Sequence, residues 1–331
     1  MSQAQQETIE PTPPVSVRGL VSAEELRRWR KPNTARALLD VSLIWVQIVA
    51  GIALYVLFPN PLTFVVAFAL VAGGQHCLHL ASHEFAHYSI LPDDRKRNDW
   101  IGTWLFAAPV GLPFAIYRHR HFYHHRMYST DRDTKTNYRF DWRGWGLARQ
   151  VVRSLSGYEY ADHVLSVVRG QGEGAEVAPG GPNPVASLPP LVISQLVLIA
   201  AFATVDVFLY LWLWILPLIT LCYFFNKVRA TKEHQPLDSD GGVDPDGPYF
   251  KGTAGPFVRS VHASWPERLF LCKINFCYHA EHHIWPQVSY QYLPEIHRRM
   301  VAGGWFDDPR FGHEATYTST IRKLFRPEEA R

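Results

Sequence analysis

Three short histidine clusters are the stretches of this sequence whose residue types and spacing point most directly to chemistry. Box one spans His83–His87 with the pattern His-x-x-x-His, whereas box two, His121–His125, and box three, His279–His283, both read His-x-x-His-His. Residues three and four positions apart lie on the same face of a helix. Each box is therefore predicted to present imidazoles from one helical face to a metal ion.

The donor atoms indicate the class of metal. Neutral imidazole binds borderline divalent ions, so a nitrogen-dominated site favours Fe, Cu, Ni or Zn over Mg or Ca. His234 lies about two helical turns beyond the fourth apolar segment, and we predict it as a further ligand, with a surface histidine as the alternative. A zinc ion takes about four ligands, so nine imidazoles indicate two ions. The predicted ligands are His83, His87, His121, His124, His125, His234, His279, His282 and His283.

Acidic residues beside the ligands are candidates for orienting them, because a carboxylate that accepts a hydrogen bond from a metal-bound imidazole fixes the ring. Glu84, Glu233 and Glu281 each adjoin a predicted ligand. His76 and His79 continue the face of box one deeper into the preceding apolar segment. We predict that these two histidines support the ligands or line a cavity and do not bind the metal themselves.

Long apolar segments must position the boxes. A hydrocarbon core roughly 30 Å thick is crossed by about 20 residues of helix. The last two predicted spans come from one apolar block, which we divide near Asp206 because a single helix of that length would be too long for the core. The predicted spans are about 39–58, 61–82, 190–205 and 207–226.

Further segments are predicted to complete the site. The stretch at about 100–117 is apolar but carries Gly and Pro, and a crossing here would put box two on the wrong side of the membrane. We therefore predict an interfacial or re-entrant segment. A helix from Pro266 to Tyr278 is expected to lead into box three, and an amphipathic helix from Leu293 to Met300 is expected to cover the site.

The charges beside the apolar segments predict the topology. Basic residues gather around Arg30, Arg97 and Arg229. The positive-inside rule places all three stretches in the cytoplasm. Both termini and all the histidine boxes then share the cytoplasmic side of a multi-pass membrane protein.

The chain is predicted to have one folded domain with two tails. Residues 1–20 are expected to be a disordered tail, 21–310 the membrane domain and 311–331 a polar C-terminal tail. The predicted fold is an all-α integral membrane protein. Four transmembrane helices carry a cytoplasmic helical cap with a histidine-rich two-metal site.

Composition and missing motifs exclude other functions. A formal net charge of +3 is too small to indicate nucleic acid binding. The sequence has no dinucleotide fingerprint, no haem-binding turn and no iron–sulfur cysteine spacing. Any electrons are therefore expected from a separate protein. The cysteines have no Cys-x-x-Cys pair and are predicted to be reduced packing residues; they are Cys77, Cys222, Cys272 and Cys277.

From about Val41 to Met300 the sequence resembles the membrane-bound fatty acid desaturase and hydroxylase superfamily. The three boxes have the order and pattern of that superfamily, and the Tyr117-Arg118 and Trp285-Pro286 pairs beside them are also similar. The resemblance implies a non-haem di-iron site that uses O2 and two external electrons to modify a lipid or acyl chain in the bilayer. It also implies a separate electron donor, of ferredoxin or cytochrome b5 type with its reductase.

Two activities fit this resemblance, and a third function does not require it. We predict an acyl-lipid desaturase, but the same ligands would serve a hydroxylase or other oxygenase acting on an alkyl, sphingoid or small amphipathic substrate, because the outcome depends on how the chain is placed. Asp131-Arg132-Asp133 replaces the Asp-Pro-Asp turn of many members, so substrate specificity is left open. A metal transporter or sensor would place its polar groups near the bilayer midplane, whereas here only His76 and His79 lie deep.

Overall fold

The structure, a computed structural model, describes residues 19–127, 133, 145–168, 180–234, 258–307 and 316–319. Regular secondary structure within these ranges is entirely helical, with no β-strand. This confirms the predicted all-α class. Most of the two predicted tails lies outside the described residues, as do Asp131 and Arg132.

Four helical runs are long and apolar enough to cross a membrane. This confirms the predicted number of candidate spans. The first two are single helices, and the third and fourth are composed of shorter pieces. The runs are α2 (Thr34–Leu57), α3 (Pro61–Ala86), the 3-10 turn η3 (Pro184–Ser187) with α8 (Leu188–Ala203), and α9 (Phe208–Tyr210) with the π-helical turns η4 (Leu211–Ile215) and η5 (Leu218–Cys222) and helix α10 (Tyr223–His234).

The last apolar block is divided near Asp206. α8 ends at Ala203, and the Asp206 carboxylate accepts a hydrogen bond of 2.9 Å from the amide of Phe208, the first residue of the next helix. A carboxylate in this position satisfies a free amide at a helix start. The single charge in the block therefore marks the turn between the two spans.

A bent pair of helices precedes box two. Its first limb comprises α4 (Arg95–Ile101), the π-helical turn η1 (Gly102–Ala107) and the 3-10 turn η2 (Ala108–Val110). The second limb is α5 (Phe114–Met127), and the two limbs meet at 95°. Gly111 at the bend has φ +72°, a left-handed conformation that glycine adopts without a Cβ penalty. The interruption predicted from Gly and Pro is thus a sharp bend that turns the chain into box two.

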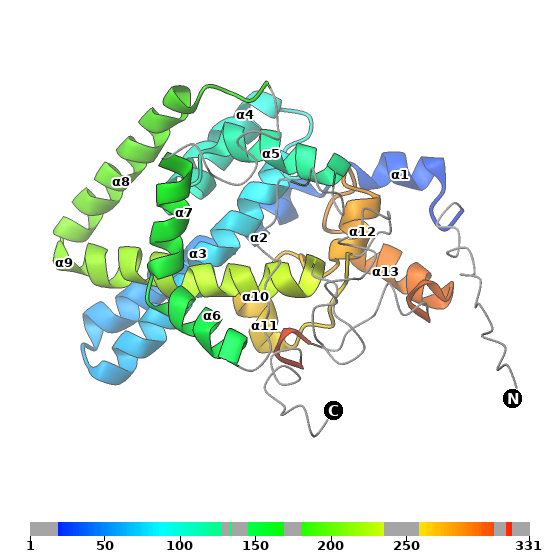
Figure 1. The fold of residues 1–331 in the computed structure, drawn as a ribbon. Coiled ribbons are helices and arrows are strands. Elements are labelled where there is room, and N and C mark those ends of the chain that lie inside the picture. Colours follow the sequence, from blue (N-terminus) through cyan, green and yellow to red (C-terminus); the bar gives the residue numbers. More distant parts are fainter. Residues whose placement is uncertain are drawn as a thin grey trace, which may run out of the picture.

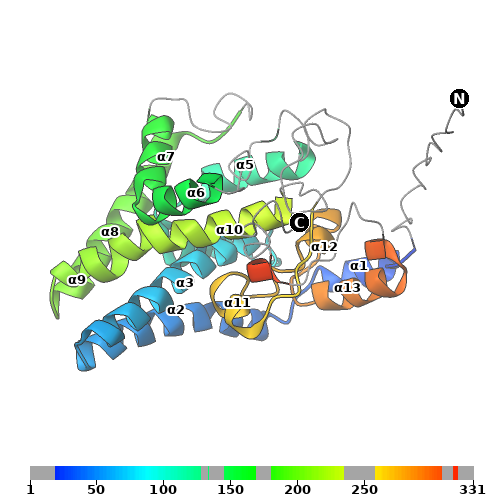
Figure 2. The same ribbon diagram turned by 60° about the horizontal axis from the view of Figure 1, so that its bottom comes forward.

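Helix α3 is the centre of the bundle. It packs against α2, the fourth span and α11 (Trp265–Phe270), and Figures 1 and 2 show α2, α3 and α10 side by side. A Cβ at Gly74 would lie 2.3 Å from the Ile48 side chain, so only glycine allows α2 this close to α3. The outer faces stay apolar and exposed, as at Val49 of α2 and Val197 of α8.

Small helices close the end of the bundle opposite α9 (Figure 1). They are α1 (Ala23–Trp29), α12 (His279–Ile284), α13 (Leu293–Ala302) and the 3-10 turn η6 (Trp305–Asp307). Helix α13 confirms the predicted covering helix. Two further helices, α6 (Trp145–Leu155) and α7 (Tyr158–Val168), form a hairpin beside the fourth span.

The predicted helix from Pro266 to Tyr278 is wrong over its second half. α11 ends at Phe270, and Ile274 and Asn275 have φ values of 56° and 58°. Non-glycine residues enter this left-handed region as single residues, not within a right-handed helix. The chain therefore reaches box three through turns.

Candidate metal centre

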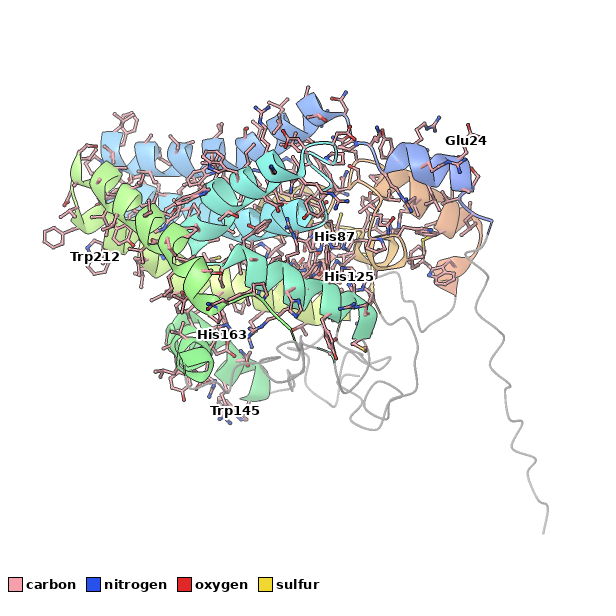
Figure 3. The ribbon with its side chains drawn as sticks, turned by 90° about the horizontal axis from the view of Figure 1, so that it is seen from above. Glu24, His87, His125, Trp145, His163 and Trp212 are labelled. Carbon is pink, nitrogen blue, oxygen red and sulfur yellow. The ribbon has the colours of Figure 1, made fainter. Side chains whose placement is uncertain are left out.

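The histidine boxes lie where four helices meet. α3 ends in box one, α5 carries box two, α10 ends at His234, and α12 consists largely of box three. Figure 3 shows His87 of box one close to His125 of box two in the interior of the molecule. All nine predicted ligands lie in this cluster, in one group of five histidines and two triads that share His234, and within each of these the potential ligand atoms are within 4.8 Å of one another.

The first group holds five imidazoles, which we call group one: His83, His87, His121, His125 and His282. The Nε2 atom of His121 lies 2.8 Å from that of His87 and 2.9 Å from that of His125. The Nε2 atoms of His125 and His282 are 3.1 Å apart. Nitrogen atoms that share an ion at roughly 2.1 Å lie roughly 3–4 Å from each other. The convergence of these atoms fits a common metal ion.

The remaining four imidazoles belong to two triads that share His234, one of His124, His234 and His283 and one of Glu233, His234 and His279. We call the four histidines of these triads group two. The Nε2 atom of His279 is 2.8 Å from that of His234 and 3.2 Å from that of His283. The Glu233 carboxylate reaches the same point, with Oε2 3.6 Å from His279 Nε2. Group two therefore combines neutral nitrogen donors with one nearby anionic oxygen.

Boxes two and three each contribute to both groups. In box two, His121 and His125 belong to group one and His124 belongs to group two. Box three reverses this division, because His282 joins group one whereas His279 and His283 join group two. Positions i and i+4 project together, and position i+3 projects to one side of them. The His-x-x-His-His pattern thus lets one helical turn serve two ions.

Polar contacts hold box one in place. The Nδ1 atom of His83 is 2.9 Å from Glu84 Oε1, and Ser89 donates a hydrogen bond of 2.5 Å to the other oxygen of Glu84. Arg118 of α5 binds Asp99 at 2.5 Å and donates to the Phe85 carbonyl, which ties box two to the end of α3. Glu84 therefore lies against a ring nitrogen of His83, and its role in orienting a metal-bound imidazole stays a prediction.

The supports of group two come from more distant parts of the chain. The buried Asp133 carboxylate lies 2.6 Å from His124 Nδ1. Glu233 forms an ion pair with Arg229, and the Tyr317 hydroxyl donates a hydrogen bond of 2.9 Å to its Oε1 atom. Sequence reasoning linked Asp133 only to substrate specificity and gave the tail that contains Tyr317 no role. The position of Asp133 shortly after box two was the one local signal.

One predicted support, Glu281, has partners other than the expected imidazole. Glu281 accepts a hydrogen bond from the Ser260 hydroxyl, and its Oε1 atom lies 2.6 Å from Nδ1 of His297. It therefore fixes box three against α13 and the segment before α11, where we had expected it to orient an adjacent imidazole. His79 lies one turn before box one on α3 and belongs to neither group.

Burial favours the neutral, metal-binding form of His125 and His283 by lowering the pKa of each ring. Burial, reinforced by the neighbouring rings of His279 and His124, holds the pKa of His283 well below its ordinary value. A neutral ring has a nitrogen lone pair to offer. The four cysteines are buried, free and outside both groups, as predicted. The donor set is thus nitrogen-rich, which suits iron.

Comparison with known proteins agrees with this architecture. Residues 59–309 match the fatty acid desaturase family model, and the chain belongs to that family. It is an oxidoreductase, a membrane lipid desaturase, of a family that generally uses iron pairs and O2. Its relatives include the sphingolipid delta(4)-desaturase DES1 of Homo sapiens, 24% identical over 86% of this chain and 80% of the relative. The DES1 protein of Gallus gallus is 25% identical, with the same coverage of each chain.

Proposed function

We propose that this protein uses two iron ions and O2 to introduce a double bond into the alkyl chain of a membrane lipid. The observation that carries this proposal is the separation of nine buried or half-buried imidazoles into a group of five and two overlapping triads that hold the other four. The names of the relatives favour a sphingoid chain as the first substrate to test, with fatty-acyl chains next.

The residues of the two groups would hold the irons, and their neighbours would keep the ring nitrogens aimed at them. When bound, the iron pair supplies the O2 chemistry that removes hydrogen from an unactivated C–H bond. Glu84 and Asp133 each lie against the Nδ1 atom of an imidazole, which leaves Nε2 directed at the metal. The helices around the cluster exclude water from this chemistry.

Product analysis tests the reaction. A host lacking its own sphingolipid and acyl-lipid desaturases is made to express this chain, and its lipids are analysed by mass spectrometry. We expect products two hydrogens lighter than the substrate. A gain of one oxygen would instead identify a hydroxylase of the same architecture, and His121→Ala provides the inactive control.

Metal analysis tests the cofactor separately. Protein purified without oxygen is expected to contain about two irons per chain and little zinc, because the donor set is rich in imidazole. Stoichiometric zinc in an active preparation that needs no added iron would contradict the di-iron proposal. A separate electron donor of ferredoxin or cytochrome b5 type is also proposed, and turnover with NAD(P)H alone would argue against it.

The proposed topology places the histidine cluster and both termini in the cytoplasm. Its support is the basic charge near Arg97 and on the helices beside the cluster, while the exposed turn at Asn60 lies at the other end of α2 and α3. Cysteines introduced at Arg97 and Asn60 are expected to label from opposite sides of sealed vesicles. Labelling of both from one side would overturn the four-span arrangement.

A further inference from the structure

The α6–α7 hairpin has an apolar surface that takes no part in the histidine cluster. We call this surface the hairpin face. Figure 3 shows Trp145 and His163 on a projection at the side of the molecule, away from His87 and His125. Contiguous exposed apolar surfaces usually mark interaction sites. The hairpin face consists of Trp145, Val152, Leu155, Tyr158, Val164 and Leu165, all of them exposed.

The depth at which the hairpin packs against the fourth span indicates what covers the hairpin face. Both helices pack against η5, and a Cβ at Gly157, between the two helices, would lie 3.5 Å from the Ile219 side chain. The span has no charged residue from Phe208 until Lys227, a length that matches a hydrocarbon core. Ile219 precedes Lys227 by eight positions, roughly 12 Å along the helix. The turn of the hairpin thus reaches below the edge of the apolar region.

An ion pair marks where that edge lies. The buried Glu159 carboxylate of α7 is 3.0 Å from the Lys227 ammonium group. Its neighbour Tyr158 is exposed, and the Arg153 guanidinium lies 4.5 Å from the centre of the Tyr158 ring. An aromatic ring beside a basic side chain is typical of the boundary between acyl chains and head groups.

The orientation of the hairpin also fits a position at the membrane interface. In Figures 1 and 2, α7 runs across the direction of α10, so it would lie in the membrane plane when α10 crosses the membrane. Helix α6 combines the apolar residues Val152 and Leu155 with the basic residues Arg149 and Arg153. Interfacial helices have this combination of an apolar face with basic residues near phosphate groups.

We propose that the hairpin face is inserted into the membrane leaflet nearest the histidine cluster, with its apolar side chains among acyl chains and its arginines at the phosphates. The protein would then be anchored in the bilayer by an in-plane hairpin as well as by its transmembrane helices. A soluble electron donor is the alternative partner, because such a protein could also bind a basic and apolar surface. The depth of Ile219 in the apolar part of the span favours lipid as the partner of the hairpin face, because a soluble protein cannot reach below the head groups.

Spin labelling in lipid nanodiscs tests the proposal. A nitroxide is attached to Val152→Cys in the full chain, and its collisions with O2 and with a water-soluble nickel complex are measured. Val197→Cys on the exposed side of α8 is the lipid-facing reference, and Glu24→Cys on α1 is the water-facing reference. The native cysteines are buried and compete little for the label. A second label, attached to Leu155→Cys, shows whether the result at Val152 comes only from local misfolding of that variant.

We expect the ratio of O2 to nickel collisions at Val152 and Leu155 to approach that at Val197 and to exceed that at Glu24 several-fold. A ratio equal to that at Glu24 would overturn the proposal. Collisions with the nickel complex that stop only when a ferredoxin or cytochrome b5-type carrier is added would also overturn the proposal, since the hairpin face would then bind the donor.

Discussion

The two groups of imidazoles differ in how they are enclosed. Group two is completely buried, whereas His87 and His125 of group one are only partly buried. Group two also has the Glu233 carboxylate beside it. Group one is therefore the more accessible of the two from outside the cluster, and group two is the one with an anionic oxygen beside its nitrogens.

The two groups also differ in the origin of their supports. Group one is held by neighbours in sequence, since Glu84 adjoins His83 and Ser89 follows five positions later. Group two depends on Asp133 and Tyr317, which lie outside the helices that carry its ligands, as well as on Arg229 of α10, one turn before Glu233. Variants at Asp133 and Tyr317 should therefore selectively weaken metal binding by group two.

The largest effect is expected for His234→Ala. His234 is buried at the end of α10, and its Nε2 atom is 2.8 Å from that of His279. Removing it leaves group two with three imidazoles, so we expect turnover to be lost and iron content to fall towards one per chain. Iron analysis together with product formation measures both.

The control for this variant is His163→Ala. His163 is exposed on α7, and the loss of such a side chain typically changes stability by less than about 0.5 kcal/mol. It should keep its iron and its activity. Full iron and near-normal activity in His234→Ala would show that His234 is not a ligand and that the boxes alone build the site.

A smaller effect is expected for Asp133→Asn. The substitution keeps the size of the side chain but replaces the carboxylate that lies 2.6 Å from His124 Nδ1. Loss of such a partner typically lowers metal affinity about 10–100-fold, so one of the two irons should dissociate first in a chelator titration. Asp162→Asn, at an exposed carboxylate on α7, is the matched control.

The same titration on Glu84→Gln tests group one, because this variant replaces the carboxylate that lies 2.9 Å from His83 Nδ1. Loss of the same iron, identified by its Mössbauer signal, from both Asp133→Asn and Glu84→Gln would contradict the assignment of these carboxylates to different groups.

The sequence predicted the local features of this site well and its long-range contacts poorly. Helical spacing determines which histidines share a face, and hydropathy determines where spans lie, so both could be derived from neighbouring residues. The spacing does not determine which face meets which helix, and the division into five and four imidazoles was therefore not predictable. Asp133 and Tyr317 were missed because their partners lie far along the chain or in another element. The helix expected after Pro266 failed at Ile274 and Asn275, where backbone conformation overrides propensity.

The smallest effect is expected for Tyr317→Phe, which removes one hydroxyl and leaves the ring. Tyr317 is fully buried, and burial raises the pKa of its hydroxyl well above the ordinary value, so the group stays protonated and donates to Glu233. Without it, the carboxylate beside group two is held by fewer contacts. We expect several-fold weaker binding of one iron and a shift of its Mössbauer signal, with the other signal unchanged.

Tyr290→Phe separates this effect from a general loss of stability. Tyr290 is also buried, and its hydroxyl donates a hydrogen bond of 3.0 Å to Asp40, outside the histidine cluster. A hydrogen bond to a charged group contributes about 1.5–3 kcal/mol, so both variants should lose similar stability in a thermal unfolding assay. Only Tyr317→Phe should change the iron signal, because only its partner carboxylate lies beside metal-binding nitrogens. An iron signal unchanged in both variants would leave Tyr317 as a packing residue and would leave Asp133 as the support of group two from outside its ligand helices.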